Sequence, residues 1–269
     1  MNVKFWGTRG TFPKVNNSAK NSLISNHTSC VQVFDNQKSI FIDAGTGFEG
    51  AARQHFEKNP TEPMSVLLTH FHWDHLIGLF SIYDLYVKGL RLHLCSGDVE
   101  LAQKAMKIFE QTYCPLKPEI IRGVFSFEVL AADQKYMEWN IHSIPVPHSG
   151  TTFAYAIQNN NKCVLFVPDI ELEKCKTEAF TKLAGLDLVI CDTFHLEADK
   201  EKLGSLGHSS DKEAIDFAVK IKAKNLALFH YSPFYSDNEI QQMFKNSQEK
   251  AKKHDLKICF SSDELLVTL

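Results

Sequence analysis

Four side chains that can bind metal ions lie within six residues of this chain: His70, His72, Asp74 and His75. They follow the apolar run of residues 66–68, so they are expected at the end of a strand. In an extended segment, residues two positions apart point the same way, which lets His70 and His72 bind one ion. The turn that follows can direct Asp74 and His75 toward a second ion. A solvated histidine-rich loop is the alternative, but so dense a motif favours a metal site.

Three more candidate ligands stand further along the chain. His148 follows an apolar run and precedes a glycine turn, Asp169 follows the run 163–167, and His230 follows the run 226–229. Side chains at strand ends are held by rigid elements, which a metal site requires. A single histidine is more often structural, and it is the presence of the other candidates that favours binding here. Imidazole and carboxylate groups suit zinc, manganese or iron, so the identity of the metal stays open.

The elements that must position these side chains follow from hydrophobic periodicity. Apolar and β-branched runs bounded by Gly, Asn, Asp or Pro predict strands at residues 3–6, 31–34, 39–42, 65–68, 153–157, 163–167, 186–190, 226–229 and 257–260. Helical periodicity predicts helices at residues 98–111, 210–223 and 237–254. Strand clusters followed by helices favour two packed sheets with helices outside, in two similar halves that meet near residues 144–147.

Helix ends carry their own signals. Ser210 is expected to cap a helix, with Glu213 completing a capping box, and Asp237 is expected to cap the last helix without such a box. Asn225 is expected to end the helix that precedes it.

Composition limits the class of protein. A chain of 269 residues with 44% hydrophobic and 23% charged residues can bury a core and is typical of soluble globular proteins. The formal net charge of −3 argues against a broad basic surface for nucleic acid, although a bound metal can still attract a small anion. Seven cysteines without close pairs predict neither a disulfide framework nor a cysteine zinc finger. With no signal peptide or membrane-spanning run apparent, a cytoplasmic protein is expected.

The motifs together resemble the metallo-β-lactamase superfamily, within it the branch of ribonuclease Z and the class II cyclic-nucleotide phosphodiesterases. The resemblance covers nearly the whole chain, in the family's order, through residues 6–10, 41–47, 69–75, 147–151, 167–169, 207–210 and 229–231. It implies an α+β four-layer αββα sandwich with two similar halves, formed by residues 1–269 as a single domain.

The resemblance also implies two divalent metal ions, zinc first, with manganese or iron compatible. The first ion would be bound by His70, His72 and His148, the second by Asp74, His75 and His230, and Asp169 would bridge the two. Asp74 is counted among the catalytic residues as well.

Asp43 is expected to accept hydrogen bonds that fix the ligand loop, although a simple turn-forming aspartate is the alternative.

The type of hydrolase is indicated by Gly-His-Ser-Ser at residues 207–210, which resembles the Gly-His-Ser-Thr element of the phosphodiesterase branch. The resemblance implies that His208 pairs with an upstream carboxylate and helps to protonate the leaving oxygen. Asp192 is the candidate partner, where relatives often have the longer glutamate. A histidine oriented by a carboxylate is a common general acid. The alternative is that His208 is merely the residue before a capped helix.

Substrate size is indicated by the 20 residues between His148 and Asp169, because ribonuclease Z carries its long tRNA-gripping arm in this interval. We therefore expect a small anionic phosphodiester, cyclic nucleotides first, with no large nucleic-acid surface and no membrane. Alternatives are a thioesterase or lactonase, a nuclease resembling the tRNA 3′-processing enzymes, and a metal-bound sensor without turnover. Relatives suggest a homodimer.

Some positions stay open. Aromatic residues between 80 and 136, such as Phe109 and Tyr113, are predicted either to stack on a base or to pack in the core. His27 is either a substrate contact or an inert replacement. His195 faces the cleft or solvent in this interpretation and receives no role.

Overall fold

Two seven-stranded sheets form the centre of the protein. The computed structural model describes residues 1–14, 24–35, 38–110, 112–159, 162–183, 185–263 and 265–269. The first sheet has the order β14 (Leu266–Thr268), β1 (Asn2–Gly7), β2 (Cys30–Asp35), β3 (Lys38–Ile42), β4 (Met64–Leu67), β5 (Leu92–Ser96), β6 (Phe125–Val129). The second has the order β13 (Lys257–Phe260), β12 (Asn225–Phe229), β11 (Leu186–Asp192), β10 (Lys162–Val167), β9 (Phe153–Asn159), β8 (Trp139–Pro145), β7 (Asp133–Tyr136).

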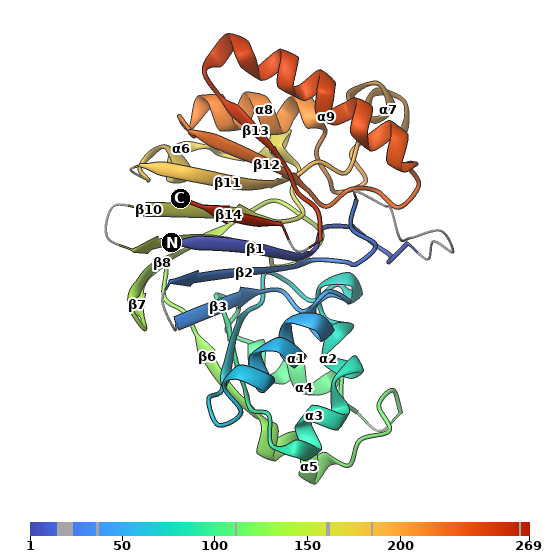
Figure 1. Ribbon diagram of the computed structural model, residues 1–269, viewed down its shortest axis with the longest axis vertical. Helices are drawn as coiled ribbons and strands as arrows, with labels where there is room; N and C mark the ends of the chain where they lie inside the picture. Colours follow the sequence, from blue (N-terminus) through green and yellow to red (C-terminus); the bar gives the residue numbers. More distant parts are fainter. Residues whose placement is uncertain (15–23, 36–37, 111, 160–161, 184, 264) are drawn as a thin grey trace.

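Helices cover the outer faces of both sheets (Figure 1). Those on the side of the first sheet are α1 (Phe48–Lys58), α2 (Gly78–Ser81), α3 (Tyr83–Lys88), α4 (Leu101–Lys107) and α5 (Pro118–Val124). Those on the side of the second are α6 (Glu178–Thr181), α7 (Glu197–Leu203), α8 (Asp211–Lys220) and α9 (Asp237–Ala251). Three 3₁₀ turns complete the described elements: η2 (Trp73–His75), η3 (Leu172–Lys174) and η4 (Lys252–His254). The predicted four-layer αββα sandwich is confirmed.

Three clusters of buried apolar side chains correspond to the three interfaces between these layers. The cluster between the sheets includes Phe5 and Trp139, both fully buried. A second cluster packs the first sheet against α1–α5, and a third packs the second sheet against α8 and α9. Removal of this much apolar surface from water is the main force that stacks the layers.

The division between the halves differs from the prediction. The chain leaves the first sheet after β6 and enters the second at β7, so it crosses near residues 130–132 rather than 144–147, which lie at and just beyond the end of β8. Among the later strands that the structure describes, only β14 returns to the first sheet, where it pairs antiparallel with β1. The apolar pattern of β7, a strand of four mostly polar residues, is too weak to mark this crossing.

Three predicted helix boundaries are wrong. The helix expected at 98–111 is α4, which is shorter, and Phe109 beyond it packs into the core against Phe125. Ser236 rather than Asp237 caps α9, and it makes a capping box with Glu239. Asn225 begins β12 instead of ending a helix, because α8 already stops at Lys220 and the chain turns before the strand.

The candidate ligands lie at one edge of the two sheets. Strands β10, β11 and β12 are parallel to one another, and β3 is parallel to β4, so within each set the carboxyl ends meet on the same side. The segments that follow β4, β8, β10 and β12 carry the ligands, and Asp192 ends β11.

None of the described helices is long and apolar enough to cross a membrane. All seven cysteines are unpaired.

Candidate metal centre

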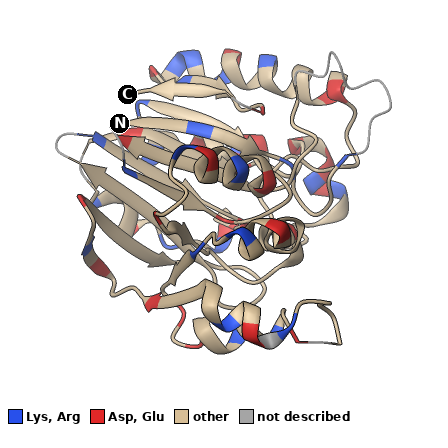
Figure 2. Cartoon of the chain, turned by 60° about the horizontal axis from the view of Figure 1, so that its bottom comes forward, with Lys and Arg blue, Asp and Glu red and all other residues tan. Residues whose placement is uncertain are grey.

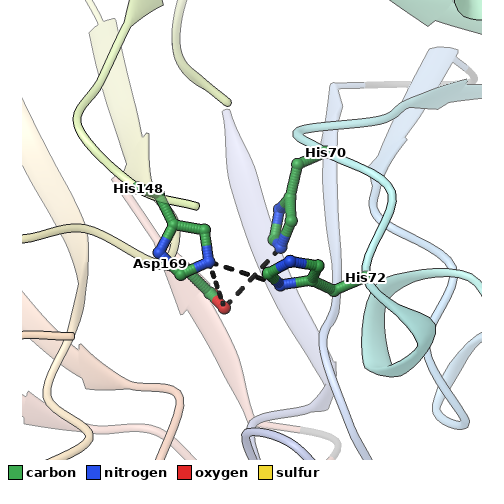
Figure 3. Close-up of side chains that lie close together, drawn as sticks. All are labelled: His70, His72, His148 and Asp169. Carbon is green, nitrogen blue, oxygen red and sulfur yellow. Dashed lines mark hydrogen bonds and ion pairs between the residues drawn. The ribbon is translucent and has the colours of Figure 1, made fainter. Parts of the chain in front are cut away.

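The structure brings all seven predicted ligands together in two groups that share one residue. In each group the ligand atoms lie within 4.8 Å of one another. The first group is His70, His72, His148 and Asp169, and the second is Asp74, His75, Asp169 and His230. The side chains of the first group point toward one another from the segments after β4, β8 and β10 (Figure 3).

Asp169 lies between the groups, and its two carboxylate oxygens face different sides. Oδ2 lies 3.7 Å from Nε2 of His70 and from Nε2 of His148. Oδ1 lies 3.2 Å from Nε2 of His75 and from Nε2 of His230. A carboxylate in this position can give one oxygen to each of two ions.

The protein's own groups leave the centre incompletely paired. Nε2 of His70 and Oδ1 of Asp169 are buried and have no hydrogen-bond partner. Two pairs of ring nitrogens face each other at 3.3 Å: His75 Nε2 with His230 Nε2, and His148 Nε2 with His72 Nδ1. Buried polar atoms normally have hydrogen-bond partners. Lone pairs that lack such partners and converge on a common point are suited to bind divalent cations.

Protonation in the centre supports this fit. Burial lowers the pKa of His70 well below its usual value, and burial also lowers the pKa of His72 and of His148. These rings are therefore neutral near pH 7 and have lone pairs for a metal. Burial opposes a charge on His75 as well, but the carboxylates of Asp169, Asp74 and Asp43 raise its pKa well above the usual value. So many buried carboxylates favour a cation among them.

Hydrogen bonds to the outer sides of the rings select the nitrogen that faces the centre. His75 Nδ1 donates to Asp43 Oδ2 at 2.7 Å, and His148 Nδ1 donates to the Gly207 carbonyl at 2.8 Å. Asp43 is fully buried, also accepts from the backbone N–H and hydroxyl of Thr69, and belongs to neither ligand group. Such bonds orient both rings so that Nε2 faces the centre, as metal-binding histidines require.

The turn after β1 holds the second group from another side. The Thr11 N–H donates to Asp74 Oδ2 at 2.8 Å, and the Gly10 N–H donates at 3.0 Å to the carbonyl of Tyr231, next to His230. Arg9 is fully buried and anchors the turn through the Ser25 and Ser232 carbonyls and Asp237. The Trp-Gly-Thr-Arg-Gly sequence is thus a support for ligands of the second group.

Gly10 leaves no room for a side chain beside His230. A Cβ there would lie 2.4 Å from the Cε1 and Nδ1 atoms of His230. Gly10→Ala should therefore displace His230 and weaken the binding of the second ion by roughly 10–100-fold, as loss of ligand support typically does. Metal titration followed by calorimetry measures this change. Gly123→Ala is the matched control, because a Cβ at Gly123 meets nothing within 4 Å. Equal metal affinity in both variants would contradict this role of the turn.

His208 stands beside the two groups and pairs with Asp192, as the sequence predicts. His208 Nδ1 donates to Asp192 Oδ2 at 3.0 Å. The Asp192 carboxylate is fully buried and also accepts the backbone N–H groups of Ile170, Phe194 and Ser209. The shorter aspartate therefore reaches the ring and is itself immobilised. Since Nδ1 is engaged, Nε2 is the nitrogen left to reach a substrate.

The surroundings of His208 favour its protonated form. Burial opposes the charge, but the Asp192 carboxylate outweighs it and raises the pKa of His208 to about 9. Phe194 stacks on the ring, with centroids 4.3 Å apart and an interplanar angle of 17°.

Strained backbone gathers around the centre. Thr11, Asp43, His230 and Leu206 are non-glycine residues in the left-handed region, with φ between 49° and 63°. This conformation costs energy for residues with a Cβ and occurs where a function requires it. Of the seven such residues that the structure describes, four lie in segments that carry or hold the candidate ligands, as expected for a functional site.

Comparison with known proteins agrees with this geometry. The family described as the beta-lactamase superfamily domain matches residues 38–231, which include all seven candidate ligands. The chain belongs to this family. Membership in the beta-lactamase superfamily, together with the two ligand groups, makes the protein a metal-dependent hydrolase, as predicted.

Relatives within the superfamily support the ribonuclease Z-like branch. The chain is similar to ribonuclease Z of Nitrosopumilus maritimus (strain SCM1), with 23% identity and 95% of each chain covered. Its fold is similar to the short form of human tRNase Z, with a TM-score of 0.67, 16% identity and coverage of 100% and 99%. It is equally similar in fold to a diphosphatase of the PhnP family, with a TM-score of 0.67, 15% identity and coverage of 100% and 97%.

The open positions of the sequence do not line the cavity that contains the metal centre. His27 is exposed and does not line the cavity that contains the centre. His195 faces neither cleft nor solvent, since it is buried and its Nε2 donates to the Ser205 carbonyl at 2.8 Å. Phe109 is a core residue, and Tyr113 is exposed outside the cavity.

Sequence reasoning missed the apolar residues that do line this cavity. They are Phe12, Phe71, Trp73, Phe194, Leu206 and Phe234. Each stands within two residues of a motif or candidate site residue, or in a loop beside one, but no local pattern indicates that they converge.

Proposed function

We propose that this hydrolase is a dinuclear phosphodiesterase that acts on small phosphodiesters, with cyclic nucleotides as the leading substrates. The observation that carries the proposal is the His208–Asp192 pair, held at 3.0 Å beside both ligand groups, with His208 lining the same cavity. A thioester hydrolase has less need of such a pair, because a thiolate leaves readily without a proton.

The chemistry divides between the metal ions and the protein. When bound, two divalent ions supply positive charge for the phosphate oxygens and a water molecule of lowered pKa. The seven ligand residues hold that charge in place, and the fixed dipoles around them need no rearrangement during the reaction. His208 gives its Nε2 proton to the alcohol oxygen that leaves phosphorus. Asp192 keeps the ring oriented and stabilises the charged imidazolium before transfer.

Substrate size is argued from the segment between His148 and Asp169. Strands β9 and β10 pair antiparallel and take up most of this interval, and residues 160–161 between them are outside the described residues. Such a short interval supports a compact substrate over tRNA. The distribution of surface charge also supports a small substrate over tRNA. Lys and Arg are interspersed with Asp and Glu over the helices shown in Figure 2 and form no broad basic surface there.

A panel of substrates tests this function. Purified, metal-analysed protein is assayed with cyclic nucleotides, linear dinucleotides, a chromogenic phosphodiester and a chromogenic thioester. We expect turnover of the phosphodiesters, highest for cyclic nucleotides, and little turnover of the thioester. Hydrolysis of the thioester alone would overturn the proposal.

A second candidate is a tRNA 3′-processing nuclease, favoured by the similarity to a protein named ribonuclease Z along 95% of the chain. A precursor tRNA in the same panel separates the two functions. Cleavage of that RNA at its 3′ end, without hydrolysis of cyclic nucleotides, would favour the nuclease.

We propose zinc as the metal, because the ligands are imidazole nitrogens and carboxylate oxygens, which zinc accepts readily. The same set also suits manganese and iron, so metal analysis of protein purified without chelators decides among them.

A further inference from the structure

The cavity over the metal centre joins a polar floor to an apolar mouth. It has a volume of about 590 Å³, and its floor includes His72, Asp74, His148, Asp169 and His208. Of the lining residues that the structure describes, none is lysine or arginine. Any positive charge that such a cavity offers a substrate therefore lies at its floor, at the metal centre.

Four large apolar side chains at the mouth stand far out in solvent. The exposed fraction is 64% for Phe12, 56% for Trp73, 66% for Leu206 and 82% for Phe234. We call these four residues the apolar rim. Clustered exposed apolar side chains are uncommon on soluble proteins and mark binding surfaces.

The rim is built from four separate segments of the chain. Phe12 follows β1, Trp73 begins η2, Leu206 lies between α7 and α8, and Phe234 lies between β12 and α9. The backbone of Leu206 adopts the left-handed region at φ 49°, which costs energy for this residue. These four side chains come together from different segments, one of which has a strained backbone. Core packing does not explain this arrangement, because the side chains stay exposed.

We propose that the apolar rim binds a planar, uncharged group of the substrate, the base of a cyclic nucleotide, while the phosphodiester lies on the metal centre. The inference rests on the proposed phosphodiesterase function. Three of the four rim residues are aromatic, and bases stack on aromatic side chains without regard to sequence. A substrate with a single negative charge suits the cavity, because a second phosphate near the rim would meet no lysine or arginine among the described lining residues.

Two matched substrates test the rim: adenosine 3′,5′-cyclic phosphate and ribose 3′,5′-cyclic phosphate, which lacks the base. Trp73→Ala should raise KM for the cyclic nucleotide by roughly 10-fold, the value of one stacked base, and should leave kcat nearly unchanged. KM for the base-free substrate should not change. Trp73→Phe should restore most of the affinity, because it keeps an aromatic ring.

Tyr113→Ala is the control, since Tyr113 is a similarly exposed aromatic residue outside the cavity.

Tryptophan fluorescence measures substrate binding independently of turnover. Trp6 and Trp139 are buried, so quenching by a slowly hydrolysed phosphorothioate analogue should report on Trp73 and be lost in Trp73→Phe. A 5′-phosphorylated dinucleotide should be a poorer substrate than its unphosphorylated form.

The outcomes distinguish failure of base binding at the apolar rim from failure of the proposed phosphodiesterase function. If the wild-type protein hydrolyses no phosphodiester, the proposed function fails. If it hydrolyses the cyclic nucleotide but Trp73→Ala leaves KM unchanged, or raises KM equally for the base-free substrate, the rim does not bind the base. A variant that alters the oligomeric state with KM unchanged would show instead that the rim binds a second copy of this chain.

Discussion

Asp169→Ala is expected to remove at least one of two metal ions per chain and to reduce hydrolysis to background. The reason is geometric, because one carboxylate oxygen faces each ligand group, at 3.7 Å from two nitrogens on one side and 3.2 Å from two on the other. No other candidate ligand belongs to both groups. Elemental analysis of protein purified without chelators measures the loss.

Two further variants make the result specific. Asp169→Asn keeps the shape of the side chain but not its charge, and it should also lose metal. Asp187→Asn is the control, because Asp187 is a buried carboxylate on β11 that bonds to Lys224 and the Cys163 N–H, outside both groups. A wild-type content of one metal ion, unchanged by Asp169→Ala, would disprove the dinuclear assignment.

His208→Ala should keep its metal ions and its fold yet lose roughly 10²–10⁴ in turnover of a cyclic nucleotide, the usual contribution of a positioned acid. The sugar alkoxide is a poor leaving group and needs the proton. The loss should be smaller for bis(p-nitrophenyl) phosphate, because p-nitrophenolate departs readily as an anion.

Asp192→Asn should follow the same order of substrates with smaller losses, since Asp192 acts through the ring it orients. Circular dichroism and metal analysis of both variants exclude a loss of fold or metal as the cause. Equal losses on the two substrates would assign His208 to binding or structure rather than proton transfer. An unimpaired His208→Ala would remove the main reason for choosing a phosphodiesterase over an ester hydrolase.

Much of the fold could be predicted from local patterns. The strands between residues 153 and 229 were predicted to within two residues at each end, because buried central strands carry unbroken apolar runs. Elements without a strong pattern were missed. The helix α1 follows a glycine-rich turn and has few buried residues, and β7 is mostly polar. The last capping residue was misplaced by one position, because Ser236 and Asp237 are both good caps; Glu239, three residues after Ser236, is the capping-box signal that distinguishes them.

By itself, the sequence determined the types and order of the candidate ligands. The histidine run and the residues after the later strands are visible because metal ligands must be particular residue types at strand ends. Asp192 could be chosen as the partner of His208 for the same reason, since it ends a strand.

Only the tertiary structure decided how these residues meet. The two oxygens of Asp169 serve opposite groups because the ends of both sheets come together around it. The turn of Arg9 and Gly10 supports Asp74 and His230 across more than 60 and 200 residues of sequence, respectively. The apolar rim likewise joins four loops. Such contacts depend on how one sheet packs on the other. This packing produces no periodicity or residue spacing in the sequence from which the contacts could be predicted.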